Sequence, residues 1–226
     1  MRAAIKPAIL VPVILLIVSP TRGNLVIIDP DPYTPGTDIS TVFDGLELQT
    51  YYDSGRVRGS VYSRAAYDPV LASTGANVFG HLMIGTDAFG RPINQTWRFP
   101  QTLLVVHFLA PADWVSFDII GNNPDGTSDR AAVDVYDADR NLIEWAQTPW
   151  LGYAEFARIT VDRGSFDISF LALSGTHGAV YIDNLRANLI PEPSSALLLL
   201  ISAVLLRPTA SSRRPGARRL ALQKKI

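Results

Sequence analysis

Two tryptophans and a tyrosine near one predicted strand are placed to form a stacking surface for a sugar. Trp145 and Trp150 flank Gln147-Thr148-Pro149, and Tyr153 follows Trp150 closely. Flat aromatic faces suit sugar rings because each face offers a large apolar area. The alternative is that these rings belong to the core, where most aromatic side chains of a β-rich domain lie.

The histidines and acids show no pattern of a catalytic site. His81, His107 and His177 are scattered, and the chain has no H-E-x-x-H, G-x-S-x-G, P-loop or G-x-G-x-x-G motif. Zero cysteines exclude thiol catalysis and iron–sulfur clusters. A carboxylate pair for glycoside hydrolysis stays open, but the sequence singles out no two acids. We therefore predict no catalytic residue, and a secreted glycan-active hydrolase or lyase is the alternative.

Two segments rich in Asp and Asn, residues 122–129 and 137–141, superficially resemble calcium loops. The second has oxygen donors at alternate positions, like the start of an EF-hand loop, but it lacks the Gly and the Glu that complete one. Asp and Asn also favour turns through hydrogen bonds to their own backbone. We predict simple turns at both segments.

The candidate side chains described above must be positioned by β-strands. The sequence shows short runs of β-branched and aromatic residues, separated by Gly, Asn, Asp and Pro. Apolar residues alternate with a period of two in 115–119 and 166–170, which indicates strands with one buried face. The sequence predicts an all-β fold: a single antiparallel β-sandwich over 41–188, preceded by an extended acidic leader over 24–40. The predicted strands are 41–52, 56–63, 78–84, 102–110, 114–120, 131–137, 141–147, 154–162, 165–173 and 179–187.

The two ends of the chain are typical of export and membrane contact. Arg2 and Lys6 precede an apolar run over 8–18, which predicts a signal peptide over 1–23. At the other end, Pro191-Glu192-Pro193 is followed by an apolar run over 196–206 and a basic tail over 207–226. As a helix this run is about 16 Å long, against roughly 30 Å of bilayer core, which favours a temporary anchor. The basic residues after it would form a stop on the cytoplasmic side: Arg207, Arg213, Arg214, Arg218 and Arg219, followed by Lys224 and Lys225.

This C-terminal order resembles the PEP-CTERM sorting signal of Gram-negative bacteria. The resemblance implies that Pro191, Glu192 and Pro193 are recognised by an exosortase-type membrane protease after the export machinery has moved the chain across the inner membrane. It also implies that the mature protein ends at the cell surface or in the extracellular matrix. An ordinary C-terminal anchor whose tail is never cut is the alternative.

Setting the ends aside reveals an acidic domain. Of 20 Lys and Arg, three lie in the signal peptide and seven in the tail, whereas of 21 Asp and Glu only Glu192 lies outside residues 24–190. The net charge of 24–190 is therefore near −10, although that of the whole chain is −1. An acidic surface without lysine argues against nucleic acid and anionic polymers, and it is compatible with divalent cations and neutral glycans.

The later strands carry a second resemblance. Residues 115–119, 133–143 and 180–186 look like the jelly-roll sandwich domains of PEP-CTERM proteins, which are similar to carbohydrate-binding modules. In such sandwiches an acid on the last strand helps to hold a structural calcium, so the resemblance implies that role for Asp183, with Asp44 or Glu47 as partners. The alternative is that Asp183 is an ordinary solvent-facing residue.

Together these patterns predict an exported, non-catalytic protein whose sandwich binds glycans or acts structurally. The expected partners are extracellular polysaccharide, as in a biofilm matrix, and transiently the inner membrane.

Overall fold

The computed structural model describes residues 23–52, 57–83, 85–86, 90, 92–123 and 129–190. Nearly all of the predicted signal peptide, the Pro191-Glu192-Pro193 motif, the apolar run at 196–206 and the basic tail lie outside these residues. Among the described residues, no helix has the length and apolar character needed to span a membrane.

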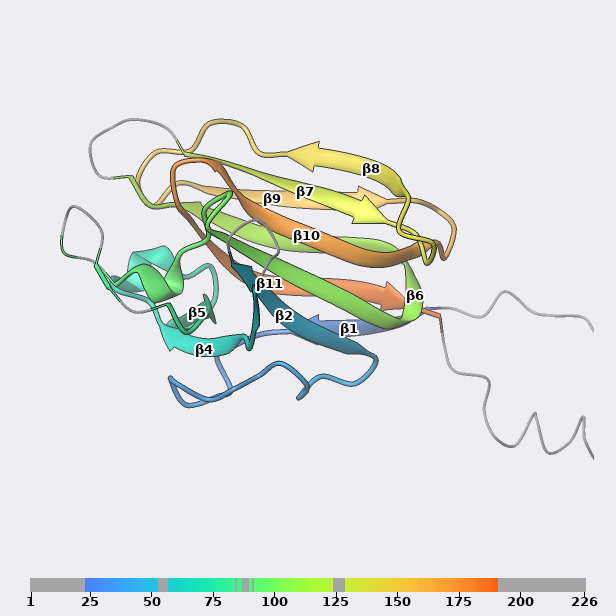
Figure 1. The fold of residues 1–226 in the computed structure, drawn as a ribbon, viewed down its shortest axis with the longest axis horizontal. Coiled ribbons are helices and arrows are strands. Elements are labelled where there is room, and N and C mark those ends of the chain that lie inside the picture. Colours follow the sequence, from blue (N-terminus) through green and yellow to red (C-terminus); the bar gives the residue numbers. More distant parts are fainter. Residues whose placement is uncertain are drawn as a thin grey trace, which may run out of the picture. The chain divides into compact units, whose positions relative to one another are not determined.

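The described chain consists of antiparallel strands and two short 3-10 helices (Figure 1). The helices are η1 (Pro69–Leu71) and η2 (Ile93–Gln95). The strands are β1 (Asn24–Ile28), β2 (Leu46–Tyr52), β3 (Val57–Gly59), β4 (Tyr62–Ala65), β5 (Asn77–Gly80), β6 (Thr102–Gly121), β7 (Arg130–Tyr136), β8 (Leu142–Gln147), β9 (Phe156–Asp162), β10 (Ile168–His177) and β11 (Val180–Leu189).

The long strand β6 belongs to two layers. Its first half pairs with β2 on one side and with β10 on the other, which gives the order β3-β2-β6-β10-β7-β8, here called sheet I. Its second half pairs with β11 and β9, which gives the order β1-β11-β6-β9, here called sheet II. β4 and β5 form a separate two-stranded sheet.

The core lies between the two sheets. Alternate residues of each strand point inward, as the burial of Leu46 and Leu48 on β2 and of Val133 and Val135 on β7 shows. These side chains form one buried cluster with Val115 and Phe117 on β6, with Ile159 and Val161 on β9, and with Leu185 and Ala187 on β11. The prediction of an all-β antiparallel sandwich is confirmed.

Two differences from the predicted strands have physical reasons. Residues 102–110 and 114–120 were predicted as two strands around Pro111, but they are one strand, because Pro111 lies where β6 passes from sheet I to sheet II. A proline at this position removes few of the backbone hydrogen bonds between the paired strands. Residues 24–28 were predicted as part of an extended leader, but they form β1 because their backbone completes the edge of β11.

The turn at 137–141 is confirmed. The backbone N–H of Asp137 donates to the carbonyl of Asn141 at 3.1 Å, and the Asp137 carboxylate accepts from the Asn141 backbone and side chain. Arg140 takes a left-handed φ of 64° there.

Candidate functional site

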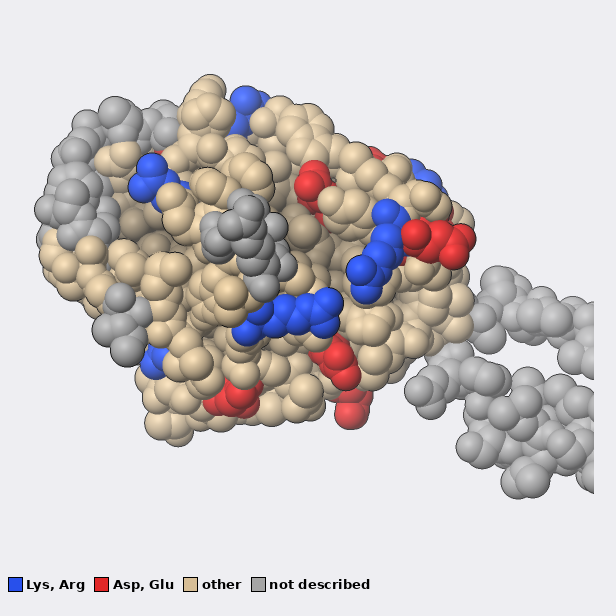
Figure 2. Space-filling view, in the orientation of Figure 1, with Lys and Arg blue, Asp and Glu red and all other residues tan. Residues whose placement is uncertain are grey.

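The outward face of sheet I contains a hollow of about 370 Å³. Its lining comes from five strands and from the turn between β7 and β8: Gln49, Tyr51, Arg58, Val105, His107, Tyr136, Arg140, Phe170, Leu171 and Ala172. In Figure 2 this face is largely uncharged, and basic and acidic side chains gather around its hollowed centre.

Strand register explains why the face is hollow. Gln49, Val105 and Ala172 lie opposite one another on β2, β6 and β10, and the short side chains of Val105 and Ala172 form a low floor. Larger side chains stand on both sides of this row, because residues two positions away on a strand share its face. Tyr51 and Arg58 form one wall, and His107, Phe170 and Tyr136 form the other. The result is a trough that crosses the strands, here called the sheet I groove.

The second wall is a line of aromatic rings. His107 and Phe170 are stacked with ring centroids 4.5 Å apart and planes at 7°. Glu47 approaches the Nδ1 atom of His107 at 3.9 Å. The hydroxyl of Tyr136 donates to Asp134 at 3.4 Å, and its pKa is raised, first by burial and then by the charge of Asp134. The wall therefore offers apolar ring area with polar atoms along its rim.

Two arginines lie above rings of opposite walls. The guanidinium of Arg58 lies 5.2 Å from the Tyr51 ring centre, and that of Arg140 lies 5.5 Å from the Phe170 ring centre. Cation–π contacts of this kind hold the side chains in place while their N–H groups stay free to donate. Within the described part of the chain, no Asp or Glu lines the groove. The groove therefore combines aromatic faces with hydrogen-bond donors, which suits a flat ligand that carries hydroxyl groups.

The structure places the three predicted stacking residues in different surroundings. Trp145 is 52% exposed and lies opposite Asp134, so it is on the groove face at the β8 edge of sheet I. Trp150 is 50% exposed and packs edge-on against His177, with Arg130 over its ring. The hydroxyl of Tyr153 donates to Asp68 at 3.2 Å. No ring contact among the described residues joins the three.

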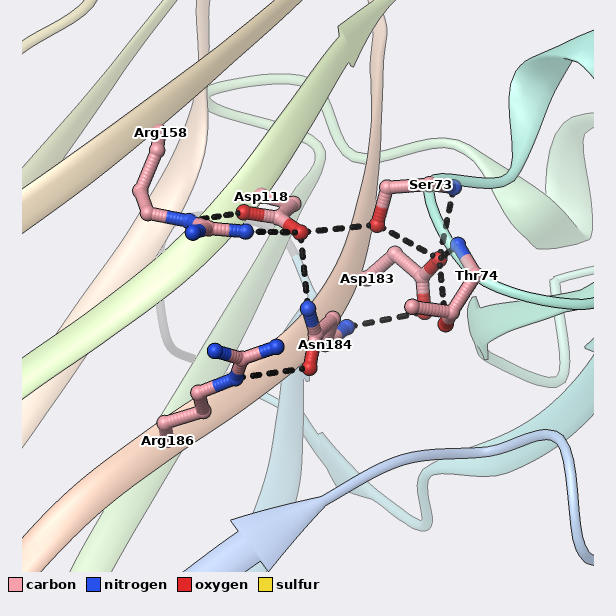
Figure 3. A network of polar contacts seen from close by, with 7 residues as sticks. All are labelled: Ser73, Thr74, Asp118, Arg158, Asp183, Asn184 and Arg186. Carbon is pink, nitrogen blue, oxygen red and sulfur yellow. Dashed lines mark hydrogen bonds and ion pairs between the residues drawn. The ribbon is translucent and has the colours of Figure 1, made fainter.

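Asp183 is buried in a polar network on sheet II rather than facing solvent (Figure 3). Its Oδ2 atom accepts from the backbone N–H of Ser73 at 2.8 Å and of Thr74 at 3.0 Å, and from both hydroxyls. Its Oδ1 atom accepts from the Asn184 backbone at 2.8 Å. Burial raises the pKa of Asp183, and these hydrogen bonds lower it by less. The carboxylate thus tethers the 73–74 loop to β11.

Asp183 is not brought together with Asp44 and Glu47. Glu47 pairs with His107 on β6, whereas Asp183 pairs with Asp118, eleven positions further along the same strand. Asp44 is exposed in the loop before β2. The described residues include no group of three His, Asp or Glu side chains that could hold a metal ion. The oxygens of Asp183 that the calcium hypothesis needs are occupied by N–H and O–H donors.

The groove residues were not predicted from the sequence as a site. His107 stands among Val105, Val106 and Phe108, which predicted packing or a polar face, and Tyr51 and Phe170 were not singled out. The available signal was the alternation itself: Leu46 and Leu48 point inward, so Gln49 and Tyr51 must point outward. Strand register decides which outward residues of different strands become neighbours. Register cannot be read from the sequence.

No protein-family model and no curated protein sequence matches this chain. The solved structures that resemble it are adhesin domains and carbohydrate-binding modules built as β-sandwiches. The K2 cleaved adhesin domain of Lys-gingipain is 13% identical, covers 74% of this chain and 100% of its own, and gives a TM-score of 0.44. TmCBM61, solved with β-1,4-galactotriose, is 13% identical, covers 65% and 89%, and gives 0.39. The CBM22-1 xylan-binding domain of Paenibacillus barcinonensis Xyn10C is 10% identical, covers 76% and 98%, and gives 0.39. At such low identities and TM-scores, the ligands in these names are properties of those proteins alone.

Proposed function

We propose that this chain is an exported, non-catalytic glycan-binding protein with a jelly-roll sandwich, and that a neutral glycan chain lies in the sheet I groove. The observation that supports this most directly is the trough itself. A floor of small side chains lies between two walls with aromatic rings, and it crosses the strands instead of ending in a closed pocket.

Each part of the groove has a role in this proposal. Sugar rings stack on Tyr51 and on the His107–Phe170 pair, because their C–H faces are apolar. Sugar hydroxyls accept from Arg58 and Arg140 and exchange hydrogen bonds with Gln49. Trp145 extends the surface toward the β8 edge.

The alternative of a hydrolase or lyase on the same sandwich has less support. Hydrolysis of a glycosidic bond requires two carboxyl groups that flank the bond from opposite sides. Glu47 lies beside His107 in one wall, whereas Asp134 lies opposite Ala172 at the β7 end of the floor row, so the two carboxyl groups stand in different rows of the face, and neither is among the residues that line the groove. A binding role therefore fits the described residues better.

Localisation is proposed from the sequence. The signal peptide at 1–23 would bring the chain out of the cytoplasm, and the PEP-CTERM-like signal at 189–226 would hold it briefly in the inner membrane until an exosortase-type protease acts. The sandwich would then serve at the cell surface or in the extracellular matrix, with polysaccharide as its partner.

Binding to neutral oligosaccharides tests the groove. The full chain in mild detergent is screened on a glycan array, and hits are titrated calorimetrically. Tyr51→Ala removes one wall and should weaken binding at least tenfold, because stacking on an aromatic ring supplies much of the contact. Trp150→Ala is the matched control, since Trp150 is half exposed but outside the groove. Equal losses in both variants, or no hit on the array, would contradict the proposal and leave a structural role.

A further inference from the structure

A second hollow lies on the outward face of sheet II, away from the groove. It measures about 420 Å³ and is lined by side chains of β6, β9, β11 and the loop around residues 70–74. The polar members of the lining are Ser73, Thr74, Asp118, Arg158, Asn184 and Arg186. Several of them form the network that Figure 3 shows.

The side-chain acceptors of this hollow are already occupied. Asp118 is buried, and its Oδ1 atom accepts from Arg158 Nε at 2.7 Å. Its Oδ2 atom accepts from Arg158 Nη2 at 3.0 Å and from Asn184 Nδ2 at 2.9 Å, and it lies 2.9 Å from the Ser73 hydroxyl, whose single proton it shares with Asp183 Oδ2. The amide oxygen of Asn184 accepts from Arg186 Nε at 3.2 Å. Little acceptor capacity is left for a ligand.

The donors, by contrast, are only partly used. Arg158 uses its Nε and Nη2 atoms on Asp118, so its Nη1 group is free among the described residues. Arg186 uses only Nε, and its two terminal nitrogens have no partner within the described chain. In Figure 3 the two guanidinium groups lie on the same side of the network and face a common space. The charge of Asp118 is paired with that of Arg158, whereas Arg186 has no carboxylate partner within the described chain; the nearest other acid of the network, Asp183, is buried and bonded to N–H and O–H donors.

The backbone fixes this arrangement. Asn184 has a left-handed φ of 46° at a bulge where the pairing of β11 with β6 shifts between Asp183 and Arg186. The bulge brings the Asn184 side chain to Asp118 and Arg186 to the Asn184 oxygen. Bulges of this kind commonly redirect a side chain beside a functional site.

We propose that this hollow binds a small oxyanion, with an organic carboxylate as the best match. Two oxygens of a carboxylate pair well with the parallel N–H groups of a guanidinium, and charge-assisted hydrogen bonds are the strong ones. Val70 and Phe156, exposed by 56% and 51%, lie beside the arginines in the lining and offer an apolar surface for the rest of the ligand. A carboxylated sugar or a short aliphatic or aromatic acid has this combination. The site is independent of the sheet I groove and of neutral-glycan binding there.

The test uses the full chain labelled with ¹⁵N and the arginine side-chain Nε–Hε signals in NMR spectra. Sodium glucuronate, sodium benzoate and sodium sulfate are titrated at constant ionic strength, with methyl glucuronate ester as the neutral control. The Arg158 and Arg186 signals should shift saturably with the carboxylates and not with the ester. Saturable shifts with sulfate but with neither carboxylate would show an inorganic oxyanion site and overturn the carboxylate assignment.

The decisive variant is Arg186→Gln, which removes the free guanidinium while Asp118 keeps Arg158. Affinity for the carboxylates should fall at least tenfold. Arg130→Gln, which removes the same charge at a position outside both hollows, should leave that affinity unchanged. Equal losses of affinity in both variants would show non-specific charge attraction and contradict the proposal. An absence of saturable shifts in the wild-type chain would also overturn it. Neutral-glycan binding in the sheet I groove is measured separately, so neither result bears on it.

Discussion

His81 is held as a neutral imidazole in the interior of the domain. Its Nε2 atom donates to the carbonyl of Thr96 at 2.9 Å, and its Nδ1 atom accepts from the backbone N–H of Met83 at 3.2 Å. The ring lies edge-on to Trp97 and is fully buried. The pKa of His81 is lowered from 6.5 to about 4, mainly by burial; the hydrogen bond to Thr96 opposes this shift, and the charge of Arg64 adds to it.

This pKa predicts loss of stability in mild acid. Above pH 6.5 the imidazole is neutral in both states, so it contributes no pH dependence. Between pH 6.5 and about 4 the unfolded chain binds a proton that the folded chain does not, so the free energy of unfolding should fall as pH falls, by about 3 kcal/mol in total. Urea titrations at pH 7.5 and 4.5 measure the drop. His81→Gln should remove most of it, and the exposed control His177→Gln should keep it; an unchanged drop in His81→Gln would show that other groups cause it.

Asp183 connects the 73–74 loop to the last strand through four hydrogen bonds and accepts a fifth from the Asn184 backbone, and it has no cation among its donors. Asp183→Ala leaves the backbone N–H groups of Ser73, Thr74 and Asn184 without their acceptor, which should lower the free energy of unfolding by about 3 kcal/mol. Asp139→Ala, in an exposed turn, is the control and should change little. Because N–H and O–H donors occupy the carboxylate, the wild-type melting temperature should be the same in calcium and in a chelator. A rise with calcium that Asp183→Ala abolishes would restore the calcium hypothesis.

At the scale of the strand, the sequence predicted the features that depend on residues close together in the chain, namely strand alternation and local turns. The alternation of Val115, Phe117 and Ile119 predicted a strand with one buried face. The structure has the strand and buries all three, but it also buries Ser116, Asp118 and Ile120, so the second face of this part of β6 is covered as well. The Asp137–Asn141 turn was predicted because Asp and Asn bond to nearby backbone. β1 was missed because a five-residue strand next to Asp-Pro pairs has little pattern of its own, and it exists only through its pairing with β11.

The candidate sites form where strands far apart in the sequence pair with one another. Their composition could not be predicted from the sequence. The sheet I groove requires that Val105, Ala172 and Gln49 come into one row, and residues 49 and 172 are far apart in the chain. Register between such strands is decided by the packing of the whole core. Asp183 was singled out for its place on the last strand, but its partners Ser73 and Thr74 come from a loop that carried no signal. Trp145 was selected for its type, and its position on the groove face follows from β7–β8 register.

At the scale of the whole chain, acidic and basic residues are separated along the sequence, with an acidic middle and a basic tail. Residues 24–190 carry 20 acids against 10 bases, whereas the last 20 residues carry seven bases and no acid. A basic segment after a short apolar run resists transfer across a membrane, so under the proposed localisation the acidic sandwich would be the exported part. Separation of the two by a single cleavage would release the sandwich and leave the basic end behind.

The tail therefore gives the last prediction. If an exosortase-type protease recognises Pro191-Glu192-Pro193, the protein recovered from its native host should have an intact mass that lacks the residues after about Pro193. Glu192→Ala should abolish the shortening and keep the full-length chain in the membrane fraction, because the charged side chain at the centre of the motif is lost. Glu155→Ala, an exposed acid of the sandwich, is the matched control and should be shortened like the wild type. A full-length mass in the wild-type protein would instead show an ordinary anchor, and the roughly 16 Å apolar run would then have to be extended by its neighbours to hold the chain in the bilayer.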